Sequence, residues 1–517
     1  MKNKFVLLMI LLGINVATFA QSSVVWKNAV TVKGNIVKSI TADNSGNIYA
    51  CVFDMGPMNK VKGVYLNKFS PNLEFDSKIE LNAEMPEIYD AWFVLDYVCI
   101  LAKGNNVYFY DLAGKLAKKT DLDPEYSYNI ITGSWFNAIV NNNYSGIKKV
   151  SNISISNDQN HIIIWGYKKT GNPKNKMDKN NGIKMYAFDR KLDQVAEKTF
   201  GFEDVFANTA EINSLQFDIS PKNKVVALCS NIPKPGQAQV FLAVFNEADK
   251  NPVVHKYSFK FEEPSFVYDF GKMDEIYISG VISEGRFRPS MKRTSDRSLY
   301  FINQSLSDKK SATPIIYDME NQIYKVYTEY SGKLRTNSID PFGIFVMDDG
   351  IMYGAMDVQK YTKTTTSSVG GMSSTSSSTY YISKSLTFIK FSFTGNIQWL
   401  KMINKEVKMS DGYEKMARLG FGQDENILKV VYCDNPANII NKSSKLVRGA
   451  MLKTVPAYAE ITSGGDISVI ALDKLGKQKL MNYPDESLLV DKNVILMDFK
   501  LKGFFNRDYF IGKAMIP

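Results

Sequence analysis

Histidine and cysteine often act as catalytic bases, nucleophiles or metal ligands, and they are scarce here, with two His and four Cys among 517 residues. The sequence contains no Gly-x-Ser-x-Gly, Gly-x-x-x-x-Gly-Lys, His-Glu-x-x-His or Cys-x-x-Cys pattern. His161 precedes the apolar run 162–165 and His255 lies within 253–257, so both are predicted to be structural residues of strands. We therefore expect no metal site and no cofactor, and the sequence names no catalytic residue.

Acidic residues offer a second kind of chemistry. Asp121 and Asp123, and likewise Asp348 and Asp349 before Gly350, are spaced as at the start of a calcium loop. Neither segment continues with alternating oxygen ligands and a closing Glu, so hairpin turns explain both. A pair of catalytic carboxylates contributed by distant segments stays open, because one sequence does not reveal spatial pairing.

Basic residues gather in two segments, 167–184 and 284–297, where they outnumber the acids. Arginine and lysine in such a pattern suit carboxylate or phosphate groups, with arginine able to bind them bidentately. A solvated loop that only keeps the protein soluble is the simpler interpretation of any one segment. The candidate ligand-binding residues are Lys168, Lys169, Arg286, Arg288, Lys292 and Arg293.

The composition is that of a globular protein, with 44% hydrophobic and 12% aromatic residues and a formal charge of +10. The four cysteines, Cys51, Cys99, Cys229 and Cys433, each lie inside an apolar run typical of a strand. They are therefore predicted to be buried, unpaired core residues rather than a disulfide framework.

The first twenty residues have the features of a secretory signal peptide. Lys2 and Lys4 precede an apolar stretch from Phe5 to Ile14, which is too short to cross a bilayer, and small residues precede Gln21. No Cys lies near Gln21, so the chain lacks the attachment site of a bacterial lipoprotein. We expect a mature chain 21–517, with a charge of +8 after loss of the two lysines, that is exported to the periplasm or the cell exterior.

Two consecutive hairpins joined by a variable loop make a unit that recurs along the chain. In residues 37–81, four runs rich in β-branched and aromatic residues alternate with turns at 44–46 and 71–73 and one loop. A shorter complete unit spans 88–122. First hairpins are expected at 150–167, 211–230, 265–282, 341–357 and 415–433, and second hairpins at 184–201, 239–259, 298–318, 386–403 and 467–484.

The chain ends supply an eighth unit, because 486–490, 493–500 and 508–516 give three strands and residues 24–30 resemble a fourth. Repeated four-stranded sheets bury both faces by packing radially on their neighbours. The sequence therefore predicts an all-β fold, a single β-propeller domain of four-stranded antiparallel blades over 21–517. Eight blades closed by the N-terminal strand are favoured over seven, and two β-sandwiches explain the repeated order less well.

Three short segments resemble known propeller repeats. Residues 41–50 resemble the Asp-x-x-Gly-Asn-Ile-Tyr signature of NHL-like propellers, and 218–227 are similar to the periplasmic WD40-like repeat. Residues 391–399 resemble the Thr-Gly-x-x-x-Trp docking turn of quinoprotein-like propellers, but the corresponding turns at 111–114 and 473–476 lack the Trp. The resemblance implies a secreted bacterial β-propeller and carries no active site, and a redox cofactor is not expected.

The loops between the two hairpins of each unit should project from one face of the ring, where function usually concentrates. Residues 362–379 contain almost only Ser, Thr and Gly and are expected to form a flexible loop. Our leading hypothesis is an exported, monomeric binding or scaffold protein whose loop face engages an envelope protein or an acidic polysaccharide, with nucleic acid excluded by export. The alternative is a glycoside hydrolase or lyase that acts on an acidic glycan through carboxylates in the central funnel.

Overall fold

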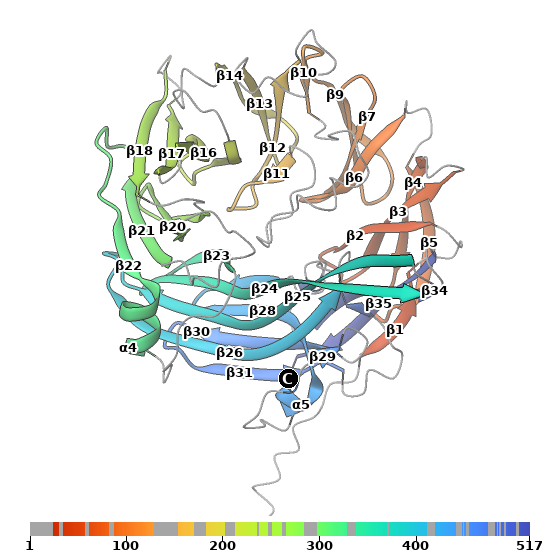
Figure 1. Cartoon of the computed structure of the whole chain (residues 1–517). Helices are drawn as coiled ribbons and strands as arrows, with labels where there is room; N and C mark the ends of the chain where they lie inside the picture. Colours follow the sequence, from red (N-terminus) through yellow and green to blue (C-terminus); the bar gives the residue numbers. More distant parts are fainter. Residues whose placement is uncertain are drawn as a thin grey trace, which may run out of the picture.

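The computed structural model describes residues 24–29, 35–56, 61–81, 87–128, 153–169, 182–201, 212–234, 237–246, 251–260, 265–283, 297–327, 338–369, 372–410, 419–440, 447, 449–450, 454–473, 481–482, 484, 487–490, 493–502 and 506–516. In this part of the chain the strands form eight sheets. Figure 1 shows the sheets arranged around a common centre in chain order, with the last sheet beside the first. This arrangement is the β-propeller that the repeated hairpins predict, with eight blades rather than seven.

The first four sheets follow one another in the sequence. They contain β2 (Ile36–Ala42), β3 (Ile48–Met55), β4 (Val61–Phe69) and β5 (Phe75–Leu81); β6 (Ile88–Val94), β7 (Tyr97–Ala102), β8 (Asn106–Asp111) and β9 (Leu116–Asp121); β10 (Tyr126–Ser127), β11 (Ile153–Ile155), β12 (His161–Lys168), β13 (Ile183–Asp189) and β14 (Gln194–Phe200); and β15 (Ile212–Ile219), β16 (Val225–Lys234), β17 (Gln237–Phe245) and β18 (Val253–Phe259).

The next three sheets continue the pattern, and short helical segments follow two of their strands. They contain β19 (Val267–Phe270), β20 (Glu275–Ser283), β21 (Arg297–Ser305) and β22 (Ile315–Asp318), followed by η2 (Met319–Tyr324) and α4 (Lys325–Tyr327); β23 (Ser338–Met347), β24 (Gly350–Val369), β25 (Met372–Phe391), β26 (Ile397–Ser410) and β29 (Gly449–Ala450); and β27 (Gly420–Asp424), β28 (Ile427–Asp434), β30 (Val455–Thr462) and β31 (Ile467–Ala471), with α5 (Pro436–Ile440) after β28.

The eighth sheet joins the two ends of the described chain. It contains β32 (Met481–Asn482), β33 (Leu488–Val490), β34 (Asn493–Lys502) and β35 (Asn506–Met515), and β1 (Val25–Asn28) pairs antiparallel with β35. The partners run from Val25 opposite Lys513 to Asn28 opposite Phe510. The predicted completion of the last sheet by the N-terminal strand is confirmed, and it covers an edge that would otherwise be open.

Within each sheet the chain runs from the centre of the ring to its rim, as the positions of β23 and β26 in Figure 1 illustrate. The second strand is buried along most of its length, and β12 exposes only its last residue. The fourth strand instead alternates exposed and half-buried residues, as in β9 and β14. Middle strands pack against neighbouring sheets on both faces, which explains their continuous apolar runs.

The turn that joins the first and second strands, and the one that joins the third and fourth, explain the repeated sequence pattern. The carboxylate of Asp43 accepts hydrogen bonds from the backbone N–H groups of Ser45 and Asn47, both at 2.9 Å. Asp111 and Asp189 accept from the residues two and four positions later in the same way. Gly46 has a positive φ of 78°, a conformation that glycine adopts without strain. These turns all lie on one face of the ring, the turn face, and the connections between second and third strands lie on the opposite loop face.

Two predicted segments differ from the structure. The second hairpin of the seventh unit is β30 with β31, not 467–484, because Gly465 has a positive φ of 90° and lets the chain reverse between Thr462 and Asp466. Residues 362–369 and 372–379 are not a loop but the paired ends of β24 and β25. Threonine has a high strand propensity, and the ladder of the sheet continues directly into this segment.

The cysteine prediction is confirmed, because all four are buried and outside any disulfide. They occupy the second strands β3, β7, β16 and β28 of four different sheets. His161 and His255 lie in β12 and β18, and both are buried. The predicted signal peptide, residues 1–20, lies outside the described residues.

Candidate functional site

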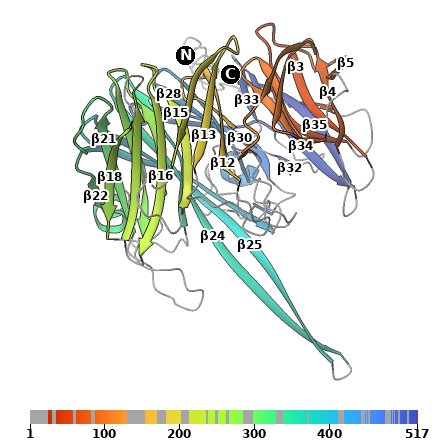
Figure 2. The ribbon, with the colours of Figure 1, turned by 90° about the horizontal axis from the view of Figure 1, so that it is seen from above.

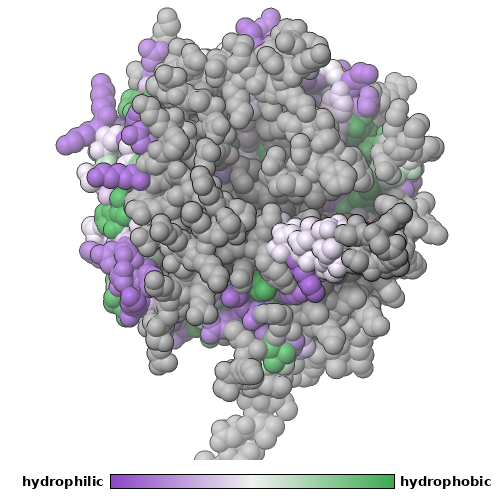
Figure 3. All heavy atoms as spheres, in the orientation of Figure 1, coloured by the Kyte–Doolittle hydropathy of each residue, from purple (hydrophilic) through white to green (hydrophobic). Residues whose placement is uncertain are grey.

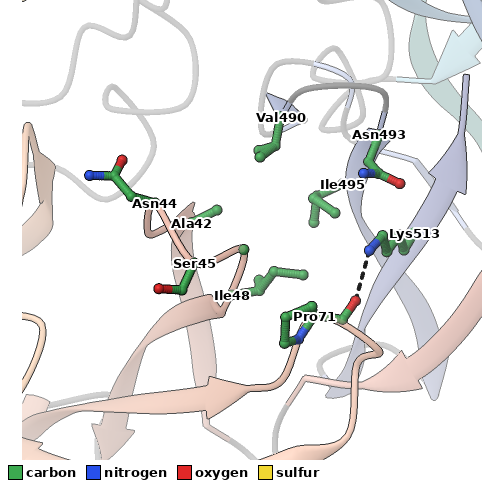
Figure 4. Close-up of a pocket in the computed structure, with 10 residues that line it drawn as sticks. Ala42, Asn44, Ser45, Ile48, Pro71, Val490, Asn493, Ile495 and Lys513 are labelled. Carbon is green, nitrogen blue, oxygen red and sulfur yellow. Dashed lines mark hydrogen bonds between the residues drawn. The ribbon is translucent and has the colours of Figure 1, made fainter.

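A pocket with a volume of about 240 Å³ lies on the turn face, between the first sheet and the last (Figure 4). Apolar side chains form much of its wall, and Lys513 closes one side by donating a hydrogen bond from Nζ to the carbonyl oxygen of Pro71 at 2.8 Å. In Figure 4 the side chains of Asn44 and Ser45 point away from the interior, whereas Val490 and Ile495 point into it. The lining residues are Ala42, Asn44, Ser45, Gly46, Ile48, Pro71, Val490, Asn493, Ile495 and Lys513.

A buried carboxylate, Asp218, lies on a first strand near the centre of the ring, at the end of β15. Its Oδ1 accepts a hydrogen bond from the N–H of Ile219 at 2.7 Å, and its Oδ2 accepts one from the hydroxyl of Tyr268 at 3.0 Å. The N–H of Asn157, in the turn after β11, lies 3.3 Å from both oxygens. Burial raises the pKa of Asp218 to about 8, and these hydrogen bonds oppose that rise because they favour the charged form.

Asp269, in β19, is a second carboxylate on a first strand, and it is half-buried. Its oxygens accept hydrogen bonds from the N–H of Phe270 at 2.8 Å and from the N–H of Val346 in β23 at 3.0 Å. The side-chain amide of Asn157 lies 3.5 Å from Oδ1, so Asn157 contacts both carboxylates. Burial raises the pKa of Asp269 to about 6. Every oxygen of the two carboxylates has a protein donor, so the pair links the first strands of neighbouring sheets.

The predicted basic residues fall into two groups. Lys168 is the last residue of β12 and Lys169 follows it on the loop face, and both are exposed. The ammonium group of Lys169 donates to the carbonyl oxygen of Pro124 at 2.7 Å, and that of Lys168 lies 3.7 Å from the carboxylate of Glu125. The structure therefore brings these two lysines together at the connection between the second and third sheets. Arg286, Arg288, Lys292 and Arg293 lie outside the described residues.

The most prominent feature of the loop face is the long hairpin of β24 and β25, whose ends extend well beyond the ring (Figure 2). We call residues 362–369 and 372–379 the ribbon. The described Ser and Thr side chains of the ribbon are exposed except for Thr379, which is half-buried, and they form a pale patch of near-neutral hydropathy in Figure 3. Hydroxyl groups face each other across the two strands, with 3.4 Å between Thr364 Oγ1 and Ser377 Oγ and 3.4 Å between Thr366 Oγ1 and Thr375 Oγ1.

At the base of the ribbon, polar groups are buried between the fifth and sixth sheets. Asp357 Oδ2 accepts a hydrogen bond from the hydroxyl of Ser385 at 2.9 Å, whereas its Oδ1 is buried without a hydrogen-bond partner. Burial raises the pKa of Asp357 to about 6, and the charges of Arg297 and Lys384 oppose this rise. Farther along, the ammonium group of Lys408 in β26 lies 4.1 Å from the centre of the Tyr380 ring. Basic side chains thus surround the point where the ribbon leaves the ring.

Lys405 is a buried amine between the sixth and seventh sheets. Its Nζ has no hydrogen-bond partner and lies 5.5 Å from the centre of the Tyr432 ring in β28. Burial lowers the pKa of Lys405 to about 8, and the nearby carboxylate of Asp434 opposes this change. The sequence analysis did not single out Lys405, Asp218 or Asp269. For Asp218 and Asp269 the available signal was a carboxylate between apolar residues of a strand, whereas Lys405 lies in a strand with several other charged residues and gave no such signal.

The two suspected calcium segments form ion pairs instead. Asp123 contacts the ammonium group of Lys184 at 2.9 Å, and Asp348 contacts that of Lys272 at 2.9 Å. No group of three or more His, Cys, Asp or Glu side chains is placed to hold a metal ion in the portion of the chain that is described. Over the same residues, no helix has the length and apolar character needed to span a membrane.

No protein-family model and no curated protein matches the sequence. Among solved structures, BamB from Moraxella catarrhalis matches 95% of this chain over 100% of its own, with 9% identity and a TM-score of 0.36. The C-terminal WD40 domain of Sif2 matches 95% of this chain over 99% of its own, with 10% identity and a TM-score of 0.41. The polysaccharide lyase Uly1 matches 95% of this chain over 91% of its own, with 8% identity and a TM-score of 0.35. Likenesses this low say nothing about the ligand or activity of this chain.

Proposed function

We propose that this protein is an exported, monomeric binding or scaffold propeller that engages another component of the cell envelope through its loop face. The observation that carries the proposal is the ribbon, which leaves the ring as a pair of strands (Figure 2) and whose described side chains are mostly exposed. The ribbon contributes little to the hydrophobic core, because its described Ser and Thr side chains are exposed, or half-buried at Thr379. Because its strands continue directly from the sixth sheet, the ribbon is suited to reach a partner.

Charge supports a partner with acidic groups. Residues 358–384 include Lys360, Lys363 and Lys384 and no Asp or Glu. Lys168 and Lys169 add positive charge elsewhere on the same face. An envelope protein with an acidic surface or an acidic polysaccharide would be attracted to this face, and the attraction would weaken at high salt.

The alternative is a glycoside hydrolase or lyase that uses Asp218 and Asp269 at the centre of the ring. The observation in its favour is that burial raises the pKa of both carboxyl groups, as is common for catalytic acids. The hydrogen bonds that these oxygens accept from backbone groups and from Tyr268 count against it, because a catalytic carboxyl group needs an oxygen that can reach the substrate.

The experiment compares residues 21–517 with a variant in which Tyr361 and Tyr380 are joined by a short Asn-Gly turn, which keeps the buried Tyr381 and Ile382. These two residues are partners in the ladder, so the change removes the ribbon and keeps the sheet beneath it. Both proteins are crosslinked in envelope extracts and assayed on arrays of acidic and neutral glycans at two salt concentrations, with release of reducing ends followed in the same wells.

We expect salt-sensitive capture of an envelope component by the intact chain, no capture by the shortened variant, and no release of reducing ends. Equal capture by both proteins would contradict the role of the ribbon. Release of reducing ends that disappears in Asp218→Asn would support the enzyme instead.

A further inference from the structure

The ribbon has two edges that no described strand covers. β24 pairs with β23 as far as Val358, and β25 pairs with β26 as far as Tyr380. Beyond these points, 362–369 and 372–379 pair only with each other. Their register is continuous from Thr362 opposite Thr379 to Val369 opposite Met372, without a bulge. Proteins usually protect exposed strand edges with bulges, prolines or charges, and here the edges lack the first two.

The register identifies which backbone groups point outward. In antiparallel pairs, hydrogen-bonded and non-hydrogen-bonded partners alternate, and side chains lie closer in the non-hydrogen-bonded pairs. The facing hydroxyl groups of Thr362 and Thr379, Thr364 and Ser377, and Thr366 and Thr375 lie within 3.5 Å of each other, which is typical of non-hydrogen-bonded pairs. The backbone N–H and C=O groups of these residues therefore point away from the ribbon and are available to a further strand.

The same sheet already accepts an added strand within this chain. β29 pairs in parallel with β26, placing Gly449 opposite Val407 and Ala450 opposite Lys408. β29 comes from the connection between the second and third strands of the seventh sheet. Strand addition at the edge of this sheet, near the base of the ribbon, is thus compatible with its twist and its surroundings.

The two edges are not equivalent. The β24 edge has threonine at four of the five positions 362–366, whereas the β25 edge consists mainly of serine, which has a lower strand propensity. The β24 edge also carries Lys360 and Lys363. A second copy of the chain would bring the same positive charges to the contact, and residues 21–517 of each copy have a formal charge of +8. Charge complementarity therefore favours a different, acidic occupant.

We propose that the outer edge of β24, residues 362–369, binds an extended acidic segment of a partner protein by strand addition. This inference rests on the proposed function and specifies how its partner is held. Main-chain hydrogen bonds to Thr362, Thr364 and Thr366 supply affinity, and Lys363 with the base of the ribbon selects acidic side chains.

The test uses three variants and two synthetic peptides. Thr364→Pro removes an outward N–H from the β24 edge without removing a hydrogen bond inside the ribbon, and Ser377→Pro does the same on the β25 edge, directly opposite. Thr364→Val loses the hydroxyl and keeps the N–H. The probes are a labelled peptide that alternates valine and glutamate over the length of the edge and a matched peptide that alternates valine and lysine. Binding is followed by fluorescence anisotropy, and protection of the Thr362, Thr364 and Thr366 amides by hydrogen exchange.

We expect the glutamate peptide to bind the wild type and Thr364→Val alike, to bind Thr364→Pro at least about tenfold more weakly, and to be little affected by Ser377→Pro. No amide protection at about 1 mM peptide, or equal binding of the lysine peptide, would overturn the proposal. Amide protection that depends on protein concentration without peptide would identify a second copy as the occupant and overturn it too. If the peptide binds as expected but envelope capture persists without the ribbon, the proposed function fails while the strand-binding edge stands.

Discussion

Replacing Asp218 by asparagine is expected to flatten the pH dependence of stability between about pH 5 and pH 7. The carboxyl group of Asp218 is 1% exposed, and burial raises its pKa from 3.8 to about 8. At neutral pH the folded protein therefore holds a proton at Asp218 that the unfolded chain releases. Asparagine is uncharged at every pH and resembles the protonated side chain in shape, so the variant lacks this proton difference.

The sign follows from proton binding. Between the unfolded and folded pKa values, the folded state binds one more proton than the unfolded state, so stability falls as pH rises. The expected slope from Asp218 approaches about 1.4 kcal/mol per pH unit, or about 3 kcal/mol from pH 5 to pH 7. Asp269 and Asp357, whose pKa values are raised to about 6, act in the same direction below pH 6. Their contribution cancels when the variant is compared with the wild type.

The assay is urea unfolding of both proteins at several pH values, with the free energies of unfolding subtracted at each pH. Tyr268→Phe provides the control, because it keeps Asp218 and removes a hydrogen bond that favours the charged carboxylate. Its slope should persist and extend to higher pH. A difference between wild type and Asp218→Asn that is constant with pH would refute the reasoning, and it would show that the hydrogen bonds from Ile219, Asn157 and Tyr268 keep the carboxylate charged. That result would also remove the argument for Asp218 as a catalytic acid.

Four further predictions concern stability. A Cβ at Gly280 would lie 1.9 Å from the backbone oxygen of Ser265, so Gly280→Ala should destabilise the protein by about 1–3 kcal/mol in urea unfolding. A Cβ at Gly63 would meet nothing within 4 Å, so the control Gly63→Ala should change the urea midpoint little. Lys405→Met should stabilise the fold at pH 7 by up to about 3 kcal/mol, because the buried amine has a lowered pKa and must lose its proton or stay charged without a hydrogen bond. An unchanged urea midpoint would contradict this prediction. Deleting residues 24–28 removes β1 and should lower the melting temperature and increase light scattering, since the outer edge of β35 then lacks its partner. A thiol reductant should leave the melting temperature unchanged, because the four cysteines are outside any disulfide.

The sequence predicted the sheets because their determinants are local. The turn at Asp43 forms within five residues, through hydrogen bonds from Ser45 and Asn47 to one carboxylate and a positive φ at Gly46. The same arrangement recurs at Asp111 and Asp189, so each hairpin carries its own signature. Where the turn signal was misassigned, as at Gly465, the predicted hairpin was displaced by one strand.

The candidate sites depend instead on residues far apart in the chain. Asn157, Asp218 and Tyr268 come from three sheets, and no pattern within one sheet shows that they meet. The ribbon was predicted as a loop because its sequence has few apolar residues. In the structure the register of β24 and β25 continues outward, so the ladder of the sheet extends into this segment. The two strands of the ribbon form backbone hydrogen bonds with each other, and these bonds order the segment although it buries little surface. Each strand is hydrogen-bonded in this way on one side only. The other side is left with outward N–H and C=O groups at Thr362, Thr364 and Thr366, and a partner strand would satisfy both the hydrogen bonds and the positive charge there.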